Sequence, residues 1–527
     1  MQLSTIDVLI VLAYLVGIFV LAQIVSREPA GHTKDAKDYF LASKALPWWA
    51  IGASLIAANI SAEQIIGMSG SGYAIGLAIA SYEWMAAATL LLVAKFVLPV
   101  FLRNRIYTMP QFLEERYGPT IRTLMAVFWL GLYIFVNLTS VLWLGSLAIG
   151  AVTGLDQLLV IVLLGGFALA YQLYGGLKAV AWTDVVQTVL LILGGLVIVW
   201  LALSRIGGEA GAIAGFSTLL ERHPGHFDMI LSPDNPFYKD LPGISVLIGG
   251  MWMMNISYWG FNQYIIQRAL AAKDIGEAQK GLLFAAFLKL LMPLIVVVPG
   301  IAALSLAPGL EKPDQAYATT MSLLPAGLLG LVFAGLVAAI ISSLGSMLNS
   351  ISTIFTLDFY AKGDRFKDYS DEELAQSKLV TVGRIVATVA MVIAVVAARP
   401  LLAGFDQGFQ YIQEYTGFFT PGIVVIFVLG LFWKRANEAG AIAAALGSFG
   451  LSILLKLVWP ELPFMDRVGL VFLLALALAV GVSIAFKARG DANRITSEGV
   501  SFATPSSFNV GAVGVIAILV ALYAIWW

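Results

Sequence analysis

The sequence predicts an all-α membrane protein that crosses the bilayer many times. Of its 527 residues, 60% are hydrophobic and only 12% are charged, against about 25% charged in an ordinary soluble domain. Apolar segments of about 20 residues, the length that crosses the hydrocarbon core, recur along the whole chain. The longest connection between them is too short for a second domain, so we expect a single membrane domain over residues 1–527.

These apolar segments predict fourteen spanning helices. The first lacks a basic start and a cleavage site, so we expect it to be retained rather than removed as a signal peptide. The spans are expected at residues 5–26, 47–69, 77–102, 120–150, 157–175, 179–204, 244–268, 278–306, 326–358, 378–398, 406–432, 438–458, 463–487 and 508–526.

Lysine and arginine divide unequally between alternate connections. One set of connections holds 22 of the 31 basic residues, whereas the other set holds seven. Basic residues collect on the cytoplasmic side of membrane proteins. The asymmetry predicts an even number of spans, both termini outside, and the long connection at residues 205–243 outside as well.

Two of the predicted spans contain polar residues at mid-bilayer depth. The stretch Pro47–Tyr73 places Asn59, Ser61, Glu63 and Gln64 within six residues, and four glycines follow. An ionised side chain at that depth costs about 2.5–3.5 kcal/mol even on the lenient insertion scale. A second interruption, NISYWGFNQ, covers residues 255–263. Interrupted helices that open two halves of five spans each predict an inverted-repeat transporter with a site near the bilayer midplane.

Other polar residues inside predicted spans could complete a binding site. Glu83 and Lys289 carry opposite charges and could pair in the bundle interior. The pair could also serve only to lock two helices together. With Gln64, Asn255 and Gln413 the pair supplies donors and acceptors of both kinds, which suits a neutral polyhydroxylated ligand better than a carboxylate.

Aromatic residues accompany these polar ones. A flat ring can cover the apolar face of a sugar while polar groups bond to its hydroxyls. Core packing or interfacial belts explain most aromatic residues in a membrane protein. The aromatic residues that compete with that explanation are Tyr82, Tyr258, Trp259, Phe409 and Tyr411.

A third polar group lies in the small-residue stretch AAIISSLGSMLNS at residues 338–350. Ser342 and Ser343 could bond to the preceding helical turn or pack against a neighbouring helix. A monovalent cation, however, needs several neutral oxygens. The two hydroxyls, with backbone carbonyls released by the break near Asn59, would provide them.

Several function classes lack support in the sequence. The chain has no cysteine, and its three histidines, His32, His223 and His226, fall in predicted loops. No metalloprotease, nucleotide-binding or nucleophile motif is present, so we expect neither an enzyme nor a resident cofactor. The net charge of −1 gives no reason to expect a nucleic-acid partner; membrane lipid is the expected surrounding.

The chain resembles the sodium/solute symporter family, and within it most closely the bacterial sodium/galactose (sodium/glucose-type) cotransporters. The resemblance implies a LeuT-type core of five plus five helices at roughly 47–432, flanking helices at 5–26, 438–458, 463–487 and 508–526, and the bacterial inner membrane. The matching stretches are SLIAANISAEQIIGMSGSGY, IASYEWM, VNLTS, YGGLKAVAWTDVVQ, YWGFNQYIIQRALAAK, AAFLKLLMP, ISSLGSMLNS and FQYIQEYTG.

The resemblance also implies roles for individual residues. Sugar would be held by Gln64, Glu83, Asn255, Lys289 and Gln413, with Tyr258 stacked on the ring as the inner gate beside Trp259. Met68, Tyr82 and Phe409 would close the outer side. Sodium would bind the carbonyls of Ala57, Ile60 and Ala339 and the hydroxyls of Ser342 and Ser343, with Asp184 on its exit route and Asn59 linking the two sites.

One position departs from the galactose symporters, because Ala86 stands where they have a serine. The preferred hexose therefore stays open. The sequence also leaves open the sodium-to-sugar ratio, the oligomeric state, for which a monomer would suffice, and the role of Glu63. We expect a sodium-coupled sugar symporter that works by alternating access. The alternatives are a symporter of another small organic solute, and a sugar sensor or cation leak without coupled accumulation.

Overall fold

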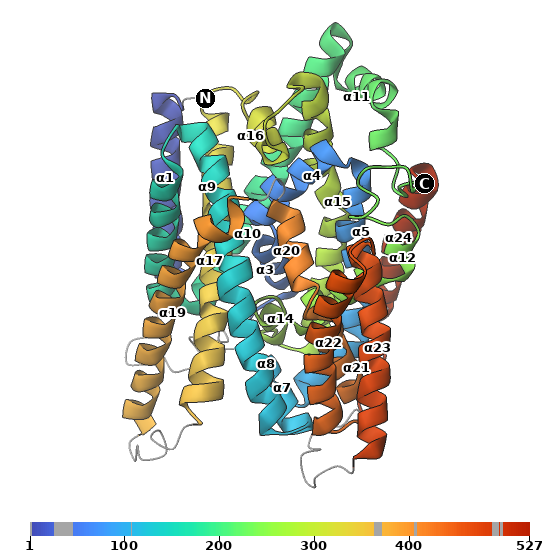
Figure 1. Ribbon diagram of the computed structural model, residues 1–527. Coiled ribbons are helices and arrows are strands. Elements are labelled where there is room, and N and C mark those ends of the chain that lie inside the picture. The colour runs from blue at the N-terminus through green and yellow to red at the C-terminus, as the bar shows by residue number, and fades with distance from the viewer. Residues whose placement is uncertain are drawn as a thin grey trace.

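A computed structural model describes residues 3–25, 46–106, 108–362, 372–404, 408–486, 495 and 499–527, which are almost entirely helical (Figure 1). His32 and the predicted span boundaries at 26, 406 and 487 lie outside the described residues. The flanking helices match their predicted bounds closely. They are α1 (Thr5–Val25), α22 (Glu438–Val458), α23 (Phe464–Ala485) and α24 (Ser506–Ile525).

Most of the remaining predicted spans also appear as long apolar helices. They are η3–α5–η4–α6 (Leu77–Arg103), α8–η5–α9 (Pro119–Thr153), α15 (Ile275–Leu306), α17–η10 (Leu328–Tyr360) and α19 (Glu372–Leu402). Within the described residues, nine helices are long and apolar enough to span a membrane, or up to eleven if each of two bent pairs is one span. The all-α fold class is confirmed, while the count of fourteen spans stays a prediction.

Helix α10 (Gln157–Gly207) covers two predicted spans in one run of 51 helical residues. A straight helix of that length would reach roughly 76 Å, more than twice the ~30 Å hydrocarbon core. Its neighbours show instead that it reverses: Leu164 lies beside Gly145, as does Ile340 of α17. Further along α10, the contacts with α17 are Gln172 at Asn349, Asp184 at Ser342, Leu190 at Gly335 and Gly194 at Val332. The contacts of α10 move along α17 in one direction up to Gln172 and in the opposite direction from Asp184 onward. Two antiparallel spans give this pattern.

Both predicted interruptions are present. The first separates α3 (Trp48–Asn59) from η2–α4 (Glu63–Ala74), and the two parts meet at 61°. The second lies at Asn262, which is extended (φ −89°, ψ 122°) between η8 (Ser257–Phe261) and α14 (Gln263–Leu270). Polar residues inside a bilayer are tolerated where they line a cavity. Their positions in the sequence therefore predicted where the two helices are interrupted.

A third bend was not predicted. The expected span 406–432 consists of α20 (Gly408–Thr416) and α21 (Thr420–Phe432), which meet at 46°. Pro421 occupies the first turn of α21, where its missing N–H leaves no unsatisfied donor. Proline also disfavours a helical conformation in the residue before it, so the sequence GFFTP was the available signal.

The two termini belong to one face of the bundle (Figure 1). Near the N-terminus, Asp7 accepts hydrogen bonds from the N–H groups of Gly327 and Gly330 at 2.7 and 2.8 Å. At the other end of the chain, Met229 N–H donates to the Trp526 carbonyl at 2.7 Å. The C-terminal end therefore contacts the long connection, and the assignment of that face to the outside stays a prediction.

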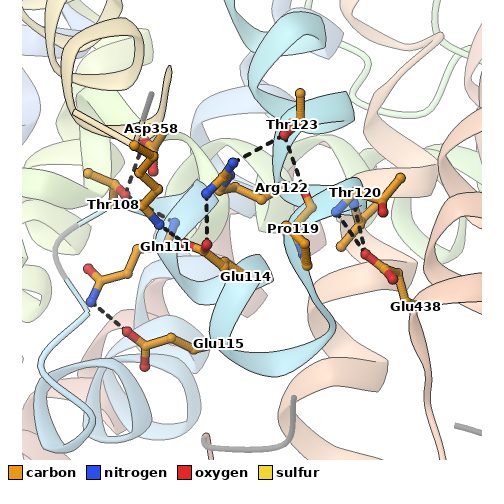
Figure 2. Close-up of polar contacts among 12 residues, drawn as sticks. Thr108, Gln111, Glu114, Glu115, Pro119, Thr120, Arg122, Thr123, Asp358 and Glu438 are labelled. Carbon is orange, nitrogen blue, oxygen red and sulfur yellow. Dashed lines mark hydrogen bonds and ion pairs between the residues drawn. The ribbon is translucent and has the colours of Figure 1, made fainter. Parts of the chain in front are cut away.

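The opposite face is tied together around α7 (Met109–Arg116) and the start of α8 (Pro119–Leu132), as Figure 2 shows. Glu114 pairs with Arg122 at 2.7 Å and also with Lys362, which follows η10. Glu438, the first residue of α22, accepts from the N–H of Thr120 at 2.8 Å, which satisfies a free donor at a helix N-terminus. These contacts join the ends of α8, η10 and α22.

Helix α15 packs closely along the first broken helix because glycines line the contact. A Cβ added at Gly300 would lie 2.1 Å from the Ser69 carbonyl, and one at Gly281 would lie 2.8 Å from the Ile51 side chain. Small residues let membrane helices approach this closely. The packing brings Lys289, midway along α15, against the break after Asn59.

Candidate functional site

A cavity of about 70 Å³ lies where the two broken helices meet. Its walls come from both breaks and from α5, η5, α20 and α21. The predicted site residues that line it are Asn59, Gln64, Tyr82, Glu83, Ala86, Asn255, Tyr258, Trp259, Phe409 and Gln413. Lys289 and Met68 are fully buried and are not among the lining residues.

Glu83, in one wall of the cavity, forms an ion pair with Lys289, which lies behind that wall. Lys289 Nζ donates to Glu83 Oε2 at 2.5 Å and to Asn59 Oδ1, and it lies 4.9 Å from the Trp259 ring centroid. Gln64 Nε2 donates to the other Glu83 oxygen at 3.2 Å. The predicted pairing of Glu83 with Lys289 is therefore present, and it fixes α15 and α5 to the first broken helix.

Asn59 connects the two breaks. Its Nδ2 donates to the Tyr258 hydroxyl at 3.1 Å, and that hydroxyl also accepts from Tyr264 at 3.0 Å. The rings of Tyr82 and Phe409, which also line the cavity, meet edge to face with centroids 5.0 Å apart.

The neutral oxygens predicted for a cation lie on the other side of the same break. Helix α3 ends at Asn59, and Ser61 N–H donates to the Asn59 carbonyl at 2.9 Å rather than to Ala57, so the Ala57 carbonyl loses its helical partner. Ser343 Oγ contacts the Ala58 carbonyl at 3.5 Å, whereas the sequence expectation named the carbonyls of Ala57 and Ile60. Ser342 Oγ donates to Asp184, which leaves its lone pairs free to face a cation.

A buried charge cluster lies beside these serines. Asp184 and Arg268 are both fully buried and form an ion pair of 3.4 Å. Arg268 also donates to Ser54 at 2.8 Å and to Ser346 at 2.6 Å, and Ser54 donates to Asp184 at 2.7 Å. The cluster joins four helices: α3, α10, α14 and α17.

Arg268 is counted among the 22 basic residues of the richer set of connections, because it is the last residue of the predicted span 244–268, and the structure corrects that count. It lies inside α14 with none of its surface exposed. Arg116 is a similar case, because its guanidinium donates to the carbonyls of Gly430, Trp433 and Ala436 near the end of α21. Both side chains bond to residues distant in sequence, and the basic excess of that set of connections persists without them.

Comparison with known proteins agrees with this arrangement. The pattern of the Sodium:solute symporter family matches residues 39–447. This chain belongs to the sodium:solute symporter family. A sodium/glucose cotransporter of Vibrio parahaemolyticus is 49% identical over 543 residues, covering 100% of this chain and 99% of that protein. A sodium/myo-inositol cotransporter 2 of Mus musculus is 34% identical over 451 residues, covering 80% of this chain and 65% of that protein.

A solved structure also shares the fold of this symporter-family chain. It is the substrate-bound, outward-open state of a Na⁺-coupled sialic acid symporter, with a TM-score of 0.78 at 23% identity. The match covers 93% of this chain and 99% of that chain. The likeness confirms the predicted fold class.

A further charged group lies beside the cavity, at Glu414 of α20. Glu414 Oε1, next to the cavity residue Gln413, accepts from Lys456 at 2.9 Å and from Arg467 at 2.5 Å. Asp240, from the long connection, lies near Glu414. Burial raises the pKa of Asp240 to about 6, and the Glu414 charge adds to the effect.

We expect Asp240→Asn to stabilise the protein at pH 7.5 but not at pH 4. The pKa of Asp240 in the folded protein lies above that of an ordinary aspartate, so the stabilisation from proton binding is complete at low pH and is lost as pH rises through about 6. Because Asp240 is partly exposed, the gain is about 1 kcal/mol after allowance for solvent screening. Thermal unfolding between pH 4 and 8 measures it, and a pH-independent difference would contradict it.

Proposed function

We propose that this chain is a sodium-coupled sugar symporter that works by alternating access. The main support is that one helix break carries both sites. Asn59 and Gln64 face the cavity, and the carbonyls at the end of α3 face Ser343. A change at this break affects both sites together, as coupled transport requires. The Vibrio parahaemolyticus relative is named a sodium/glucose cotransporter, which favours a hexose.

The proposed roles are those that the family resemblance implies. Sodium binds at Ala57, Ile60, Ala339, Ser342 and Ser343, bridging α3 and α17 in an outward-open state. Sugar then binds at Gln64, Glu83, Asn255, Lys289, Gln413 and Tyr258, and the complex closes and opens inward. Coupling requires that sodium prefer one state, because a ligand with equal affinity for both shifts nothing. The remaining proposed roles are gating by Met68, Tyr82, Phe409, Tyr258 and Trp259, sodium exit past Asp184, and coupling through Asn59.

The proposed setting is the bacterial inner membrane with both termini outside. Sodium is the coupling ion, lipid surrounds the helices, and one chain suffices for transport. Uptake of radiolabelled galactose and glucose into proteoliposomes, with and without an inward sodium gradient, tests the proposal. Accumulation above the external concentration only with the gradient supports it. Sodium flux that is indifferent to sugar would indicate a leak instead.

A cyclic polyol is the second candidate substrate, since the Mus musculus relative is named a sodium/myo-inositol cotransporter. A polyol presents hydroxyl groups to the same polar walls, so the pairing of Glu83 with Lys289 does not separate the two candidates. Radiolabelled myo-inositol in the same uptake assay decides between them. Sodium-driven accumulation of myo-inositol without hexose uptake would favour the polyol.

We expect Ser343→Ala to weaken the sodium dependence of uptake. The change removes one neutral oxygen near the Ala58 carbonyl and leaves the cavity residues in place. The sodium concentration for half-maximal uptake should rise at least about tenfold, the effect of losing roughly 1.4 kcal/mol. Ser350→Ala, a buried serine further along α17, is the matched control. Normal sodium dependence in the Ser343 variant would exclude this hydroxyl as a ligand.

A further inference from the structure

Glu63 is a buried carboxylate to which neither the sequence nor the proposed mechanism gives a role. It lies in η2, directly after the first helix break, and lines the cavity. Only 8% of its surface is exposed. Within the described part of the chain, its Oε1 has no hydrogen-bond partner and its carboxylate has no ion-pair partner. Ionising a buried carboxyl group is costly unless it is paired or bonded, so Glu63 is ionised only when the contents of the cavity supply the partner.

Four more buried oxygens in the same cavity lack partners among the described residues. They are the amide oxygens Gln64 Oε1 and Asn137 Oδ1 and the hydroxyls of Tyr82 and Thr416. The Gln64 amide orientation follows from its neighbour, because Nε2 faces a Glu83 carboxylate oxygen and an exchanged amide would place two acceptors together. The two amide oxygens and an ionised Glu63 can only accept hydrogen bonds, whereas the two hydroxyls can also donate them.

Several donors at the cavity are engaged within the protein. Asn59 Nδ2 donates to Tyr258, and Asn255 Nδ2 donates to the Met251 carbonyl at 3.1 Å. Lys289 Nζ, behind the wall, is shared by Glu83 and Asn59. Three oxygens that can only accept when Glu63 is ionised, and the hydroxyls of Tyr82 and Thr416, therefore remain for a ligand. A ligand that completes the cavity has to donate hydrogen bonds to these acceptors, as hydroxyl and ammonium groups do and a carboxylate does not.

We propose that Glu63 is a specificity-determining residue that accepts hydrogen bonds from the hydroxyl groups of the substrate. The same carboxylate accommodates an ammonium group, so amino sugars join neutral hexoses as a substrate class and acidic sugars are excluded. This inference rests on the proposed sugar transport. It differs from the roles of Glu83 and Lys289, whose charges compensate each other.

Competition by sugar analogues tests the assignment. Inhibition of sodium-driven galactose uptake is measured for galactose, each of its monodeoxy analogues and 2-amino-2-deoxygalactose, in the wild type and in Glu63→Gln. A hydrogen bond to a charged group is worth about ten- to a hundredfold in affinity. We expect Glu63→Gln to weaken the affinity for galactose by about that factor. The wild type and the variant should have equal affinities for the one deoxy analogue that lacks the hydroxyl bound by Glu63.

The amino sugar gives a second readout. Its affinity relative to galactose should fall in Glu63→Gln, because the variant keeps the side-chain shape but loses the negative charge. A loss of equal size for every analogue would show that Glu63 acts on the fold, and it would overturn the proposal. Glu209→Gln, on an exposed residue of the long connection, is the matched control and should leave all affinities unchanged. If the wild type takes up no hexose with sodium, the proposed function fails instead, which is a separate outcome.

Discussion

Lys289→Ala should abolish sodium-driven sugar uptake, the largest functional loss that we expect from one substitution. Its ammonium is fully buried and donates to both Glu83 and Asn59. Without it the Glu83 carboxylate stays buried beside the cavity with only Gln64 as a donor. Breaking a buried ion pair on one side costs about 3–5 kcal/mol. Uptake in proteoliposomes should fall by more than about a hundredfold.

A second variant separates transport from folding. In Glu83→Gln/Lys289→Met both charges are gone, so no buried charge is left alone, and much of the lost thermal stability should return. Uptake should stay absent, because Asn59 has lost the donor that connects it to α15. The chain contains no cysteine, so a single introduced cysteine can report folding by labelling without a background. Recovery of uptake in the double variant would show that the pair only locks helices.

The spans and both helix breaks could be predicted because a bilayer imposes a simple energetic rule. Helix α22 has the bounds that hydropathy gave, at residues 438–458, since apolar length is a property of the local sequence. Asn59 and Asn262 are polar residues at mid-bilayer depth, and both lie at helix breaks. Polar residues at mid-depth are tolerated where the chain lines a cavity, so their position alone indicates one.

The rest of the site depends on partners distant in sequence. Arg268 bonds to Ser54, 214 residues away, and to Asp184, 84 residues away. A local reading of the chain cannot distinguish such an arginine from a basic residue in a loop. The bend at residues 417–419 had a local signal in Pro421, but the packing of Gly417 against Val468 of α23 is a distant contact. The roles of the cavity residues came from the family resemblance, and they stay proposals.

Arg268→Gln should cause the largest loss of stability, together with a loss of sodium affinity. The guanidinium donates to Ser54 and Ser346 as well as pairing with Asp184, all at positions with almost no exposure. Its removal leaves the Asp184 charge buried, which costs about 3–5 kcal/mol of unfolding free energy. Asp184 also accepts from Ser342. A displaced Asp184 would therefore misplace a hydroxyl of the proposed sodium site.

Two partner variants make this expectation specific. Arg268→Lys keeps the charge, but one ammonium cannot reach all the groups that the planar guanidinium joins, so its stability should be intermediate. Arg268→Gln/Asp184→Asn removes the buried charge and should regain thermal stability without regaining sodium affinity. Thermal unfolding with and without sodium measures both quantities. If Arg268→Gln unfolds at the wild-type temperature, the cluster does not hold α3, α10, α14 and α17 together. If the double variant binds sodium normally, Ser342 is positioned by its own helix rather than by Asp184.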